Sequence, residues 1–410
     1  MTTDVRAVPE LPLSAVEEWR ASGADLVEVL ARAQREVGGI AAIPLGPTPS
    51  VLVTDPVAVQ HVLGRHPDRY VKRSHRARML VGDGVLSATG DAWKRQRQLL
   101  QSQFTGTGMR RYEQRIAEAA QRTAARWAGY ARTGETFDVG EEMRRFALDT
   151  VWRALTGYPL DDDAERELAA VQRVVAAMPT LPADSGDARD AVAEDLARID
   201  AICHAAIDAA RSSNASGVLQ VLLDAGDQHP EYTDQLIRDE LVTLLVAGHE
   251  TTATTLTWLY LLLDRHPEAR TADPQALVSE TLRLYPSAWM LPRHAIEDDV
   301  LAGHHVPAGT DILVCPYLTH RDPTLWPDPE RFDPARFTAT GTRPAHLAAY
   351  YPFGLGARAC LGTQFALRET TALLELLLPA YELAFQSTPT RAAYSITVRP
   401  DGPTPAVLLK

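Results

Sequence analysis

The spacing of hydrophobic and polar positions along the chain predicts a mainly helical protein. From about residue 91 to residue 285, apolar residues recur at three- and four-residue spacing, which is typical of amphipathic helices. The longest such stretch starts after Thr233 or Asp234, either of which can cap a helix, and continues to about Asp264. At about 1.5 Å per residue that helix is ~45 Å long, so we expect it to lie inside one large domain. Residues 180–187 interrupt the helical pattern and predict a mobile loop.

Short β elements are predicted before and after this helical core. The segment of about 38–60 indicates two short strands around a turn followed by a helix, and the segment of about 299–315 indicates a β-hairpin. A further helix is expected at about 360–380, and strands in the tail. Between hairpin and helix, the Pro-rich stretch 320–351 predicts a long coil, which is unusual in a compact domain and is therefore expected to be pinned. We interpret residues 1–410 as a single domain.

Composition and charge exclude several classes of protein. With 45% hydrophobic and 23% charged residues, the chain can bury a substantial core and is not disordered. Its net charge of -12 argues against general nucleic-acid binding, which needs a basic surface. No uninterrupted apolar stretch reaches the ~18 residues of a membrane span, and the N-terminus lacks the pattern of a signal peptide. Cys203, Cys315 and Cys360 are far apart, which fits a reducing compartment. We therefore expect a soluble, cytoplasmic monomer that binds neither nucleic acid nor membranes.

The first candidate for chemistry is the segment YPFGLGARACLGTQFALRET, residues 351–370. Cys360 stands at the predicted start of a helix, where the helix dipole and loop N–H groups favour a thiolate. Such a thiolate is a good axial ligand for haem iron, and Arg358 can neutralise a propionate. Glycines in the loop let the backbone lie flat against a planar ring. The alternatives are a structural cysteine and a dinucleotide-binding loop, but no βαβ unit follows, which counts against the second.

The second candidate is AGHETT, Ala247–Thr252, in the middle of the long predicted helix. Gly248 and the threonine hydroxyls weaken the regular hydrogen-bond ladder, which opens space for O2 and water beside a metal. Glu250 and Thr251 can then relay protons. The alternative is a polar patch in a packed helix. A zinc-protease site is excluded, because the second histidine that it needs would stand at Ala253.

Two pairs of residues at helical spacing are the remaining candidates. Glu280 and Arg283 are three residues apart on a predicted helix, a spacing that by itself indicates a surface ion pair. Trp93 and Arg97 are four residues apart and share one helix face, where both could donate to the same anionic group. Each pair is ordinary when taken alone. Their order along the chain, together with the two motifs above, makes them informative.

Taken together, the string F-x-x-G-x-R-x-C-x-G at residues 353–362 and the other three motifs resemble the cytochrome P450 family, and the resemblance covers nearly the whole chain. It implies a single-domain cytochrome P450 fold, mainly α with small β-sheets, and haem b (iron protoporphyrin IX) as the cofactor. Trp93 stands where many bacterial members have a histidine. The resemblance makes Cys360 the metal ligand, and it assigns to the haem site Cys360, Arg97, Trp93, Arg293, Arg358, Phe353, Gly354, Gly362 and Ala247.

The resemblance also assigns catalytic, structural and substrate-binding roles. The acid–alcohol pair Glu250 and Thr251 lies over the distal face of the haem in the family, and Thr252 joins it as a catalytic candidate. Glu280 and Arg283 become a buried pair that braces the haem-binding core. The arginine that completes this brace is expected to be Arg336 and not Arg331 of the string PERF. The implied substrate pocket consists of Val246, Ala247, Ser287, Ala288, Trp289, Met290, Leu291 and Ile396.

The function implied is a haem-thiolate monooxygenase that inserts one oxygen atom of O2 into a hydrophobic small molecule. Because the sequence holds no flavin domain, the electrons are expected from a separate ferredoxin and its reductase. Family habit and the Ala/Arg-rich composition favour a bacterial enzyme of antibiotic or other secondary-metabolite biosynthesis, acting on a polyketide, macrolactam or terpenoid. Two alternatives stay open: a peroxide-driven haem enzyme, against which Glu250 and Thr251 count, and a non-catalytic haem-binding protein.

Overall fold

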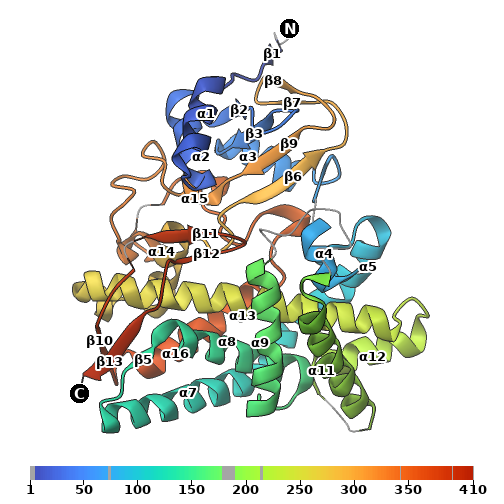
Figure 1. Ribbon diagram of the computed structural model, residues 1–410, viewed down its shortest axis with the longest axis vertical. Helices are drawn as coiled ribbons and strands as arrows, with labels where there is room; N and C mark the ends of the chain where they lie inside the picture. Colours follow the sequence, from blue (N-terminus) through green and yellow to red (C-terminus); the bar gives the residue numbers. More distant parts are fainter. Residues whose placement is uncertain are drawn as a thin grey trace. The chain divides into compact units, whose positions relative to one another are not determined.

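The structure is a computed structural model that describes residues 5–72, 75–177, 190–212, 216–341, 343–389 and 391–409 (Figure 1). The loop predicted at residues 180–187 lies outside the described residues. By their internal contacts the residues divide into two compact units. Unit 1 comprises Met1–Arg73, Ser279–Cys360 and Thr397–Arg399, and unit 2 comprises Ser74–Val278, Leu361–Ile396 and Pro400–Lys410.

Unit 1 is built around two small sheets. The five-stranded sheet has the order β2 (Ile40–Ile43), β3 (Ser50–Val53), β9 (Asp311–Val314), β6 (Leu291–Ala295) and β4 (Tyr70–Val71). Strands β3 and β9 run parallel, and the other neighbours run antiparallel. The three-stranded sheet has the order β1 (Arg6–Ala7), β8 (His304–Val306) and β7 (Asp299–Leu301). The segment predicted as one hairpin therefore divides, because β7 and β8 pair with each other while β9 joins the larger sheet.

The helices of unit 1 are short. Its α-helices are α1 (Leu13–Ser22), α2 (Leu26–Glu36), α3 (Pro56–Gln60) and α15 (Pro316–Thr319). A π-helical turn, η1 (His61–Arg65), continues α3. Two 3-10 turns lie in the long coil, η3 (Pro334–Phe337) and η4 (Leu347–Ala349), and a third, η5 (Gly356–Arg358), lies in the loop before Cys360. The coil predicted over residues 320–351 is thus almost free of regular structure. What fixes it is described below with the ion network that it surrounds.

Unit 2 contains the helical core that the sequence predicts. Its helices are α4 (His75–Val81), α5 (Gly90–Gln101), α6 (Thr107–Arg110), α7 (Glu113–Thr133), α8 (Val139–Thr156), α9 (Asp162–Ala177), α11 (Ala193–Ser212), α12 (Val218–Gln228), α13 (Asp234–Arg265), η2 (Pro267–Thr271) and α16 (Thr363–Leu377). Helix α14 (Pro274–Leu284) begins in unit 2 and ends in unit 1. A sheet of β10 (Glu382–Phe385), β13 (Pro405–Leu409) and β5 (Phe137–Asp138) completes the unit, and β11 (Ala392–Tyr394) and β12 (Val398–Pro400) lie in the tail.

Helix α13 has 32 residues and is the long helix predicted from the sequence. The Thr233 hydroxyl caps it by accepting a hydrogen bond from the N–H of Leu236 at 3.3 Å. Most of its side chains are buried, and α8 and α16 pack beside it within unit 2 (Figure 1). Gly248 permits a close approach to α8, since a Cβ at that position would lie only 2.9 Å from a methyl group of Val151.

The start of α16 is anchored by aromatic packing within unit 2. The ring of Phe365 meets those of Phe104 and Tyr112 edge to face, with centroids 6.1 and 5.5 Å apart. Such edge contacts add ~0.5–1.5 kcal/mol to the burial of the rings. The helix that follows the Cys360 loop is therefore fixed at its first turn. Among the helices described, none combines the length and apolar character needed to cross a membrane.

Candidate functional site

The Cys360 loop of unit 1 folds back on itself through backbone hydrogen bonds. The N–H of Cys360 donates to the carbonyl of Phe353 at 2.7 Å, and the N–H of Gly354 donates to the carbonyl of Tyr351 at 2.9 Å. Cys360 is exposed, whereas burial raises the pKa of the Cys203 and Cys315 thiols to about 12. Of the three cysteines, Cys360 alone therefore presents an accessible sulfur that can act as a ligand.

Two glycines of this loop are required by its backbone. Gly354 and Gly356 have φ angles of 71° and 70°, in the left-handed region that other residues rarely adopt. A Cβ on Gly356 would also lie 2.3 Å from the carbonyl oxygen of Leu63 in η1. At Gly362, by contrast, φ is -89° and a Cβ would meet nothing within 4 Å. Gly362 therefore borders open space, which fits the close approach of a flat cofactor that the sequence predicts there.

Three cations of unit 1 gather near Cys360. Arg293 lies on β6 and is 8% exposed, and its Nη1 donates to the carbonyl of Pro292 at 2.9 Å. Burial and the charge of Arg358 lower the pKa of Arg293 to about 10. Burial, Arg293 and Arg358 together lower the pKa of Lys72 to about 7, although Cys360 opposes the shift. Cations that disfavour one another in this way favour the binding of an anion, and the two propionates of a haem would fit that preference.

Lys72 was not identified from the sequence. It belongs to no motif, because it stands in the short segment between β4 and α4, and a lone lysine in a loop carries no pattern. The fold brings it to the other two cations, since β4 pairs with β6, the strand that carries Arg293. The signal that reveals it is the shared electrostatic environment and not the spacing of residues.

The predicted brace is a saturated network inside unit 1. The Nε and Nη2 atoms of Arg283 donate to Oε2 and Oε1 of Glu280 at 2.7 and 2.8 Å, and both side chains are fully buried. The N–H of Asp333 donates to Oε1 of Glu280 at 2.8 Å. Arg336 lies with its Nε 3.6 Å from the same oxygen, and its Nη2 donates to the carbonyl of Asp328 at 3.0 Å. Oε1 of Glu280 thus accepts two hydrogen bonds and Oε2 accepts one, all from partners inside unit 1.

The long coil is held by the guanidinium of Arg283. That group donates to the backbone carbonyls of His320, Pro329 and Arg331 at 2.9, 2.6 and 3.0 Å. Arg331, which was not expected to complete the brace, contributes only this carbonyl, and its side chain is exposed. Irregular backbone inside a domain is tolerated only when its polar groups find partners. The brace supplies those partners, which is the physical reason that a coil of this length is ordered.

In the acid–alcohol segment of α13, Ala247–Thr252, some side chains are partly exposed and others are buried. Glu250 and Thr251 are partly exposed, and the Thr251 hydroxyl donates to the carbonyl of Ala247 at 2.8 Å. His249 is buried and lies with Nδ1 2.8 Å from the carbonyl oxygen of Leu245, and burial lowers its pKa. Thr252 is also buried. Glu250 and Thr251 are therefore accessible for proton transfer, whereas His249 and Thr252 face the protein interior.

Trp93 and Arg97 lie one turn apart on α5 of unit 2, and both are half-buried. The side chain of Gln96, between them in sequence, is buried and donates to the carbonyl of Asp83 at 3.0 Å. This bond holds α5 against the preceding loop, and Trp93 and Arg97 share a face of the helix because they are four residues apart. Their assignment to the haem stays a prediction.

The residues predicted to form the substrate pocket fall into two groups by exposure. Ser287 and Trp289 are 5% and 4% exposed, and the carbonyl of Trp289 accepts from the Cys315 thiol at 3.4 Å, so both belong to the interior of unit 1. The accessible ones are Val246, Ala247, Ala288, Met290, Leu291 and Ile396. These accessible residues belong to both units, and their assignment to a substrate pocket stays a prediction.

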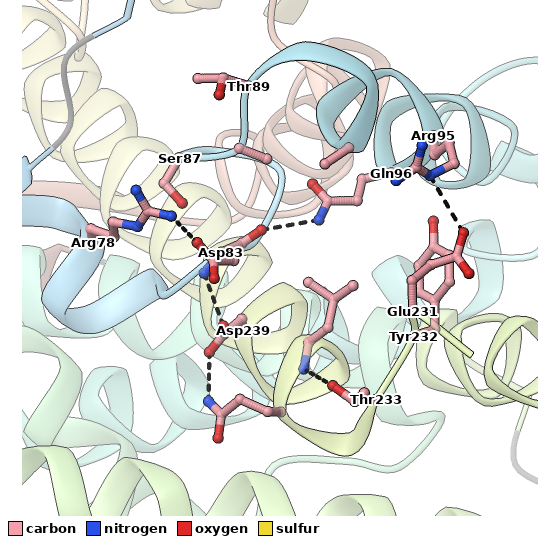
Figure 2. A pocket seen from close by; sticks show the side chains of 14 residues that line it. Arg78, Asp83, Ser87, Thr89, Arg95, Gln96, Glu231, Tyr232, Thr233 and Asp239 are labelled. Carbon is pink, nitrogen blue, oxygen red and sulfur yellow. Dashed lines mark hydrogen bonds and ion pairs between the residues drawn. The ribbon is translucent and has the colours of Figure 1, made fainter. Parts of the chain in front are cut away.

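A cleft in unit 2 has a volume of ≈ 400 Å³ and lies between the loop before α5 and the first turns of α13 (Figure 2). Its charged side chains are paired with each other: Arg78 with Asp83, and Arg95 with Glu231 at 3.4 Å. The N–H of Asp83 donates to Asp239 at 2.9 Å. None of the residues of the predicted site lines it. We therefore assign this cleft to the packing of the loop and not to the predicted chemistry.

Comparisons with a family model, with related sequences and with solved structures all identify proteins of one family. A family model described as cytochrome P450 matches residues 9–272 and 275–402. Cyclooctatin synthase of Streptomyces melanosporofaciens is 31% identical over 379 residues, covering 82% of this chain and 81% of that protein. Pentalenene oxygenase of Streptomyces avermitilis is 29% identical over 387 residues, 85% of each chain. The crystal structure of CYP175A1 from Thermus thermophilus matches 98% of this chain and 100% of its own, with 30% identity and a TM-score of 0.78.

Proposed function

Because this chain belongs to the cytochrome P450 family and is a monooxygenase of that family, we propose that it inserts one oxygen atom of O2 into an apolar terpenoid. The mainly helical P450 fold with small sheets is the one predicted from the sequence. The observation that supports the substrate class is the similarity to terpenoid-oxidising relatives, cyclooctatin synthase and pentalenene oxygenase among them. A polyketide or macrolactam is the competing substrate class.

The family implies a haem-thiolate cofactor, and the residues present fit that group. Cys360 is the proposed iron ligand because its sulfur is accessible in a loop that backbone hydrogen bonds close. Arg293, Arg358 and Lys72 are proposed to neutralise the propionates, and Trp93 and Arg97 to donate to them as the family resemblance implies. When bound, the haem supplies the activation of O2, to which a thiolate ligand contributes by donating electron density.

Two segments of the chain are proposed to receive the substrate and deliver protons. The accessible apolar side chains of Ala288, Met290 and Leu291 gain ~25 cal/mol for each Å² of apolar surface removed from water, which favours a hydrocarbon-rich ligand. Glu250 and Thr251 hold and pass protons toward the reacting oxygen, and exclusion of bulk water keeps those protons from leaking. Electrons are proposed to arrive from a separate ferredoxin and its reductase.

Titration with candidate ligands tests the substrate class. Apolar terpene alcohols and hydrocarbons should shift the Soret band of the resting protein at lower concentration than macrolactams or polyketides of similar size. Ala288→Phe should weaken terpenoid binding by about tenfold, or ~1.4 kcal/mol. Leu347→Phe introduces the same ring at an 81% exposed position of the same unit and serves as the control. A tighter response to polyketides would transfer the proposal to that class.

Two further variants test the proposed ligand and the proposed proton transfer. Cys360→His should lose the strongly red-shifted Soret band of the reduced, CO-bound protein, together with monooxygenation. Retention of both would contradict ligation by Cys360. Thr251→Ala should keep its haem and its fold, but a larger share of the electrons should be lost to peroxide or water. If NAD(P)H consumption stays fully coupled to product, Thr251 has only a structural role.

Lys72→Met tests the lysine that the fold adds to the predicted haem site. Removal of one proposed partner of a propionate should speed haem loss to an acceptor protein by about tenfold, which corresponds to ~1.4 kcal/mol. Lys94→Met is the matched control, because Lys94 is exposed on α5 and pairs with Asp91 at 3.0 Å. Equal rates of haem loss from the two variants would remove Lys72 from the site.

A further inference from the structure

His320 is a buried residue of unit 1 that bonds both to the brace and to the segment leading into the Cys360 loop. It follows the short helix α15 and is 0% exposed. Its ring Nε2 accepts a hydrogen bond from the backbone N–H of Tyr351 at 3.0 Å, and its backbone carbonyl accepts from Arg283 at 2.9 Å. Its own N–H donates to the carbonyl of Pro316 at 2.8 Å. A single residue therefore connects two parts of unit 1 that the sequence predicted separately.

The imidazole of His320 is neutral, and the bond that it accepts selects one tautomer. Burial, together with the charges of Arg283 and Arg321, lowers its pKa to about 3. Because Nε2 accepts from Tyr351, the ring proton lies on Nδ1. Nδ1 is buried and has no hydrogen-bond partner among the residues described. An unpartnered buried N–H costs at least as much stability as one neutral hydrogen bond contributes. The ring therefore adds little net stability, and what it contributes is the place at which it holds Tyr351.

Tyr351 is held at both ends by two consecutive residues of the chain. His320 accepts from its backbone N–H, and the Thr319 hydroxyl lies 2.8 Å from its phenolic oxygen. Tyr351 is 2% exposed, and its ring meets the ring of His320 edge to face with centroids 5.3 Å apart. A residue that is bonded at its backbone and at the end of its side chain can neither slide nor turn without breaking one of those bonds.

Tyr351 is also the first residue of the turn on which Cys360 closes. The Tyr351 carbonyl accepts from the N–H of Gly354 at 2.9 Å, and the carbonyl of Phe353 accepts from the N–H of Cys360 at 2.7 Å. Because Tyr351 and Phe353 lie in one turn, a shift of the first displaces the second. The hydrogen-bonded path from the brace to Cys360 thus runs through His320 and Tyr351, and all of it lies inside unit 1.

We propose that His320 is a positioning residue that transmits the fixed geometry of the brace to the Cys360 loop and thereby sets the position of the sulfur. This role rests on the proposed ligation of the haem iron by Cys360. Arg283 supports it in two ways, because it bonds to the His320 carbonyl and because its charge, added to burial, keeps the ring unprotonated with Nε2 able to accept. Groups that orient a metal ligand without touching the metal commonly tune the site.

Two substitutions at position 320 separate the hydrogen bond from the packing. His320→Phe keeps a ring beside those of Tyr350 and Tyr351, which lie 5.3 Å from the ring of His320, but it has no acceptor. His320→Gln keeps an oxygen that can accept from Tyr351. In the haem-loaded protein the Tyr351 amide should exchange its hydrogen about tenfold faster in His320→Phe and at nearly the wild-type rate in His320→Gln. Urea denaturation should show little change for His320→Phe, because the unpartnered Nδ1–H is lost as well.

The CO-bound spectrum reports whether the effect reaches the sulfur. In the reduced, CO-bound protein, the strongly red-shifted Soret band of thiolate ligation should be lost about tenfold faster in His320→Phe, and His320→Gln should restore the slow rate. Tyr350→Phe is the matched control, because it removes one hydrogen bond, to the carbonyl of Ser279 at 2.9 Å, from the residue next to Tyr351. The band should persist in this control as in wild type.

Each alternative outcome gives a definite answer. Wild-type exchange and a wild-type band in His320→Phe would overturn the proposal, and so would equal losses in His320→Phe and His320→Gln, which would mean that only packing matters. If His320→Phe fails to load haem, Thr319→Val carries the test, because it frees the other end of Tyr351. Its band should then be lost faster than in the control, and a wild-type rate would refute the role of Tyr351. Neither measurement needs a substrate, so failure of the proposed terpenoid oxidation leaves both decisive.

Discussion

Two buried glutamates pin irregular segments of the chain, and they differ in how completely they are bonded. In unit 1, Glu280 accepts hydrogen bonds from Arg283 and from the N–H of Asp333 and lies beside Arg336. In unit 2, Glu240 on α13 accepts one bond, from the N–H of Val85 at 3.0 Å, and its Oε1 is buried without a partner among the described residues. Glu280 therefore holds its segment through several bonds, whereas Glu240 holds its loop through one.

The loop that Glu240 holds is fastened to α13 by three consecutive residues. Arg238 donates to the carbonyl of Leu80 at 2.7 Å, and Asp239 accepts from the N–H of Asp83 at 2.9 Å. These two are charged partners of each other, at 3.0 Å. Glu240 has no such partner among the residues described, and burial raises its pKa to about 7 despite the bond from Val85. Burial raises the pKa of Glu280 as well, but the bonds from Arg283 and Asp333 and the charge of Arg336 oppose that shift, whereas Glu240 has only the bond from Val85.

The largest effect should come from breaking the saturated network. Arg283→Met keeps the length of the side chain but leaves the charge of Glu280 buried and three coil carbonyls without a donor. The expected loss is ~3–5 kcal/mol in the free energy of unfolding, enough to prevent haem loading. Urea denaturation at fixed haem concentration measures it. A loss below about 1 kcal/mol would mean that the coil is held by other contacts.

An intermediate effect is expected at the edge of the same network. Arg336→Leu removes a guanidinium 3.6 Å from Glu280, but the closer bonds from Arg283 remain. Loss of its hydrogen bond to the Asp328 carbonyl should cost ~1–3 kcal/mol in the free energy of unfolding. Arg331→Leu is the matched control and should change little, because only the backbone carbonyl of Arg331 takes part.

A smaller effect that depends on pH is expected at Glu240. Because its pKa is higher in the folded protein than in the unfolded chain, its contribution to stability is full below about pH 4.5 and declines as the pH rises toward 7. Glu240→Gln should remove that decline, so the variant should match wild type at pH 5 and be more stable at pH 8. Denaturation at both values, with hydrogen exchange of residues 82–87, checks it. An unchanged difference between pH 5 and 8 would contradict the titration.

The smallest effect should follow Thr243→Val. The Thr243 hydroxyl is buried without a partner among the residues described, and a Cβ on Gly84 would lie 2.2 Å from it. Replacing an unbonded hydroxyl by a methyl group of the same shape should be neutral or stabilise by up to about 1 kcal/mol. Thr252→Val provides the contrast, because the Thr252 hydroxyl of the same helix donates to Oε1 of Glu369 at 2.8 Å. A clear destabilisation by Thr243→Val would reveal a bond that this site makes in solution.

Short sequence patterns predicted the features that depend on neighbouring residues, such as helix caps and helix faces. Thr233 caps α13 as its side chain suggested, and the spacing of Glu280 and Arg283 placed them on one helix face. By itself, the spacing of Glu280 and Arg283 indicated an ion pair on the surface. Their complete burial depends on a coil that closes over them from 37 to 53 residues further along the chain, which no short window of sequence contains. The family resemblance supplied what periodicity could not.

The residues that sequence reasoning missed owe their importance to contacts between segments that are distant in the sequence. Lys72 matters because β4 pairs with β6, and Glu369 because α16 packs on α13. Glu369 did leave a trace, since it stands four residues after Phe365 and four before Leu373 on the buried stripe of its helix. A single acid in an apolar stripe indicates a buried carboxyl group, but only the structure reveals Thr252 as its hydrogen-bond partner.

The haem site proposed beside Cys360 would tie the amount of folded protein to the supply of cofactor. Besides burial, Arg293 and Arg358 lower the pKa of Lys72, and Arg358 lowers that of Arg293, so a bound anion would relieve part of this repulsion. A group that binds only the folded chain stabilises it by RT ln(1 + [L]/Kd). Each tenfold rise in free haem therefore adds ~1.4 kcal/mol once the site is saturated. In a cell short of haem, more of the protein would be unfolded and degraded by proteases, so its amount would fall.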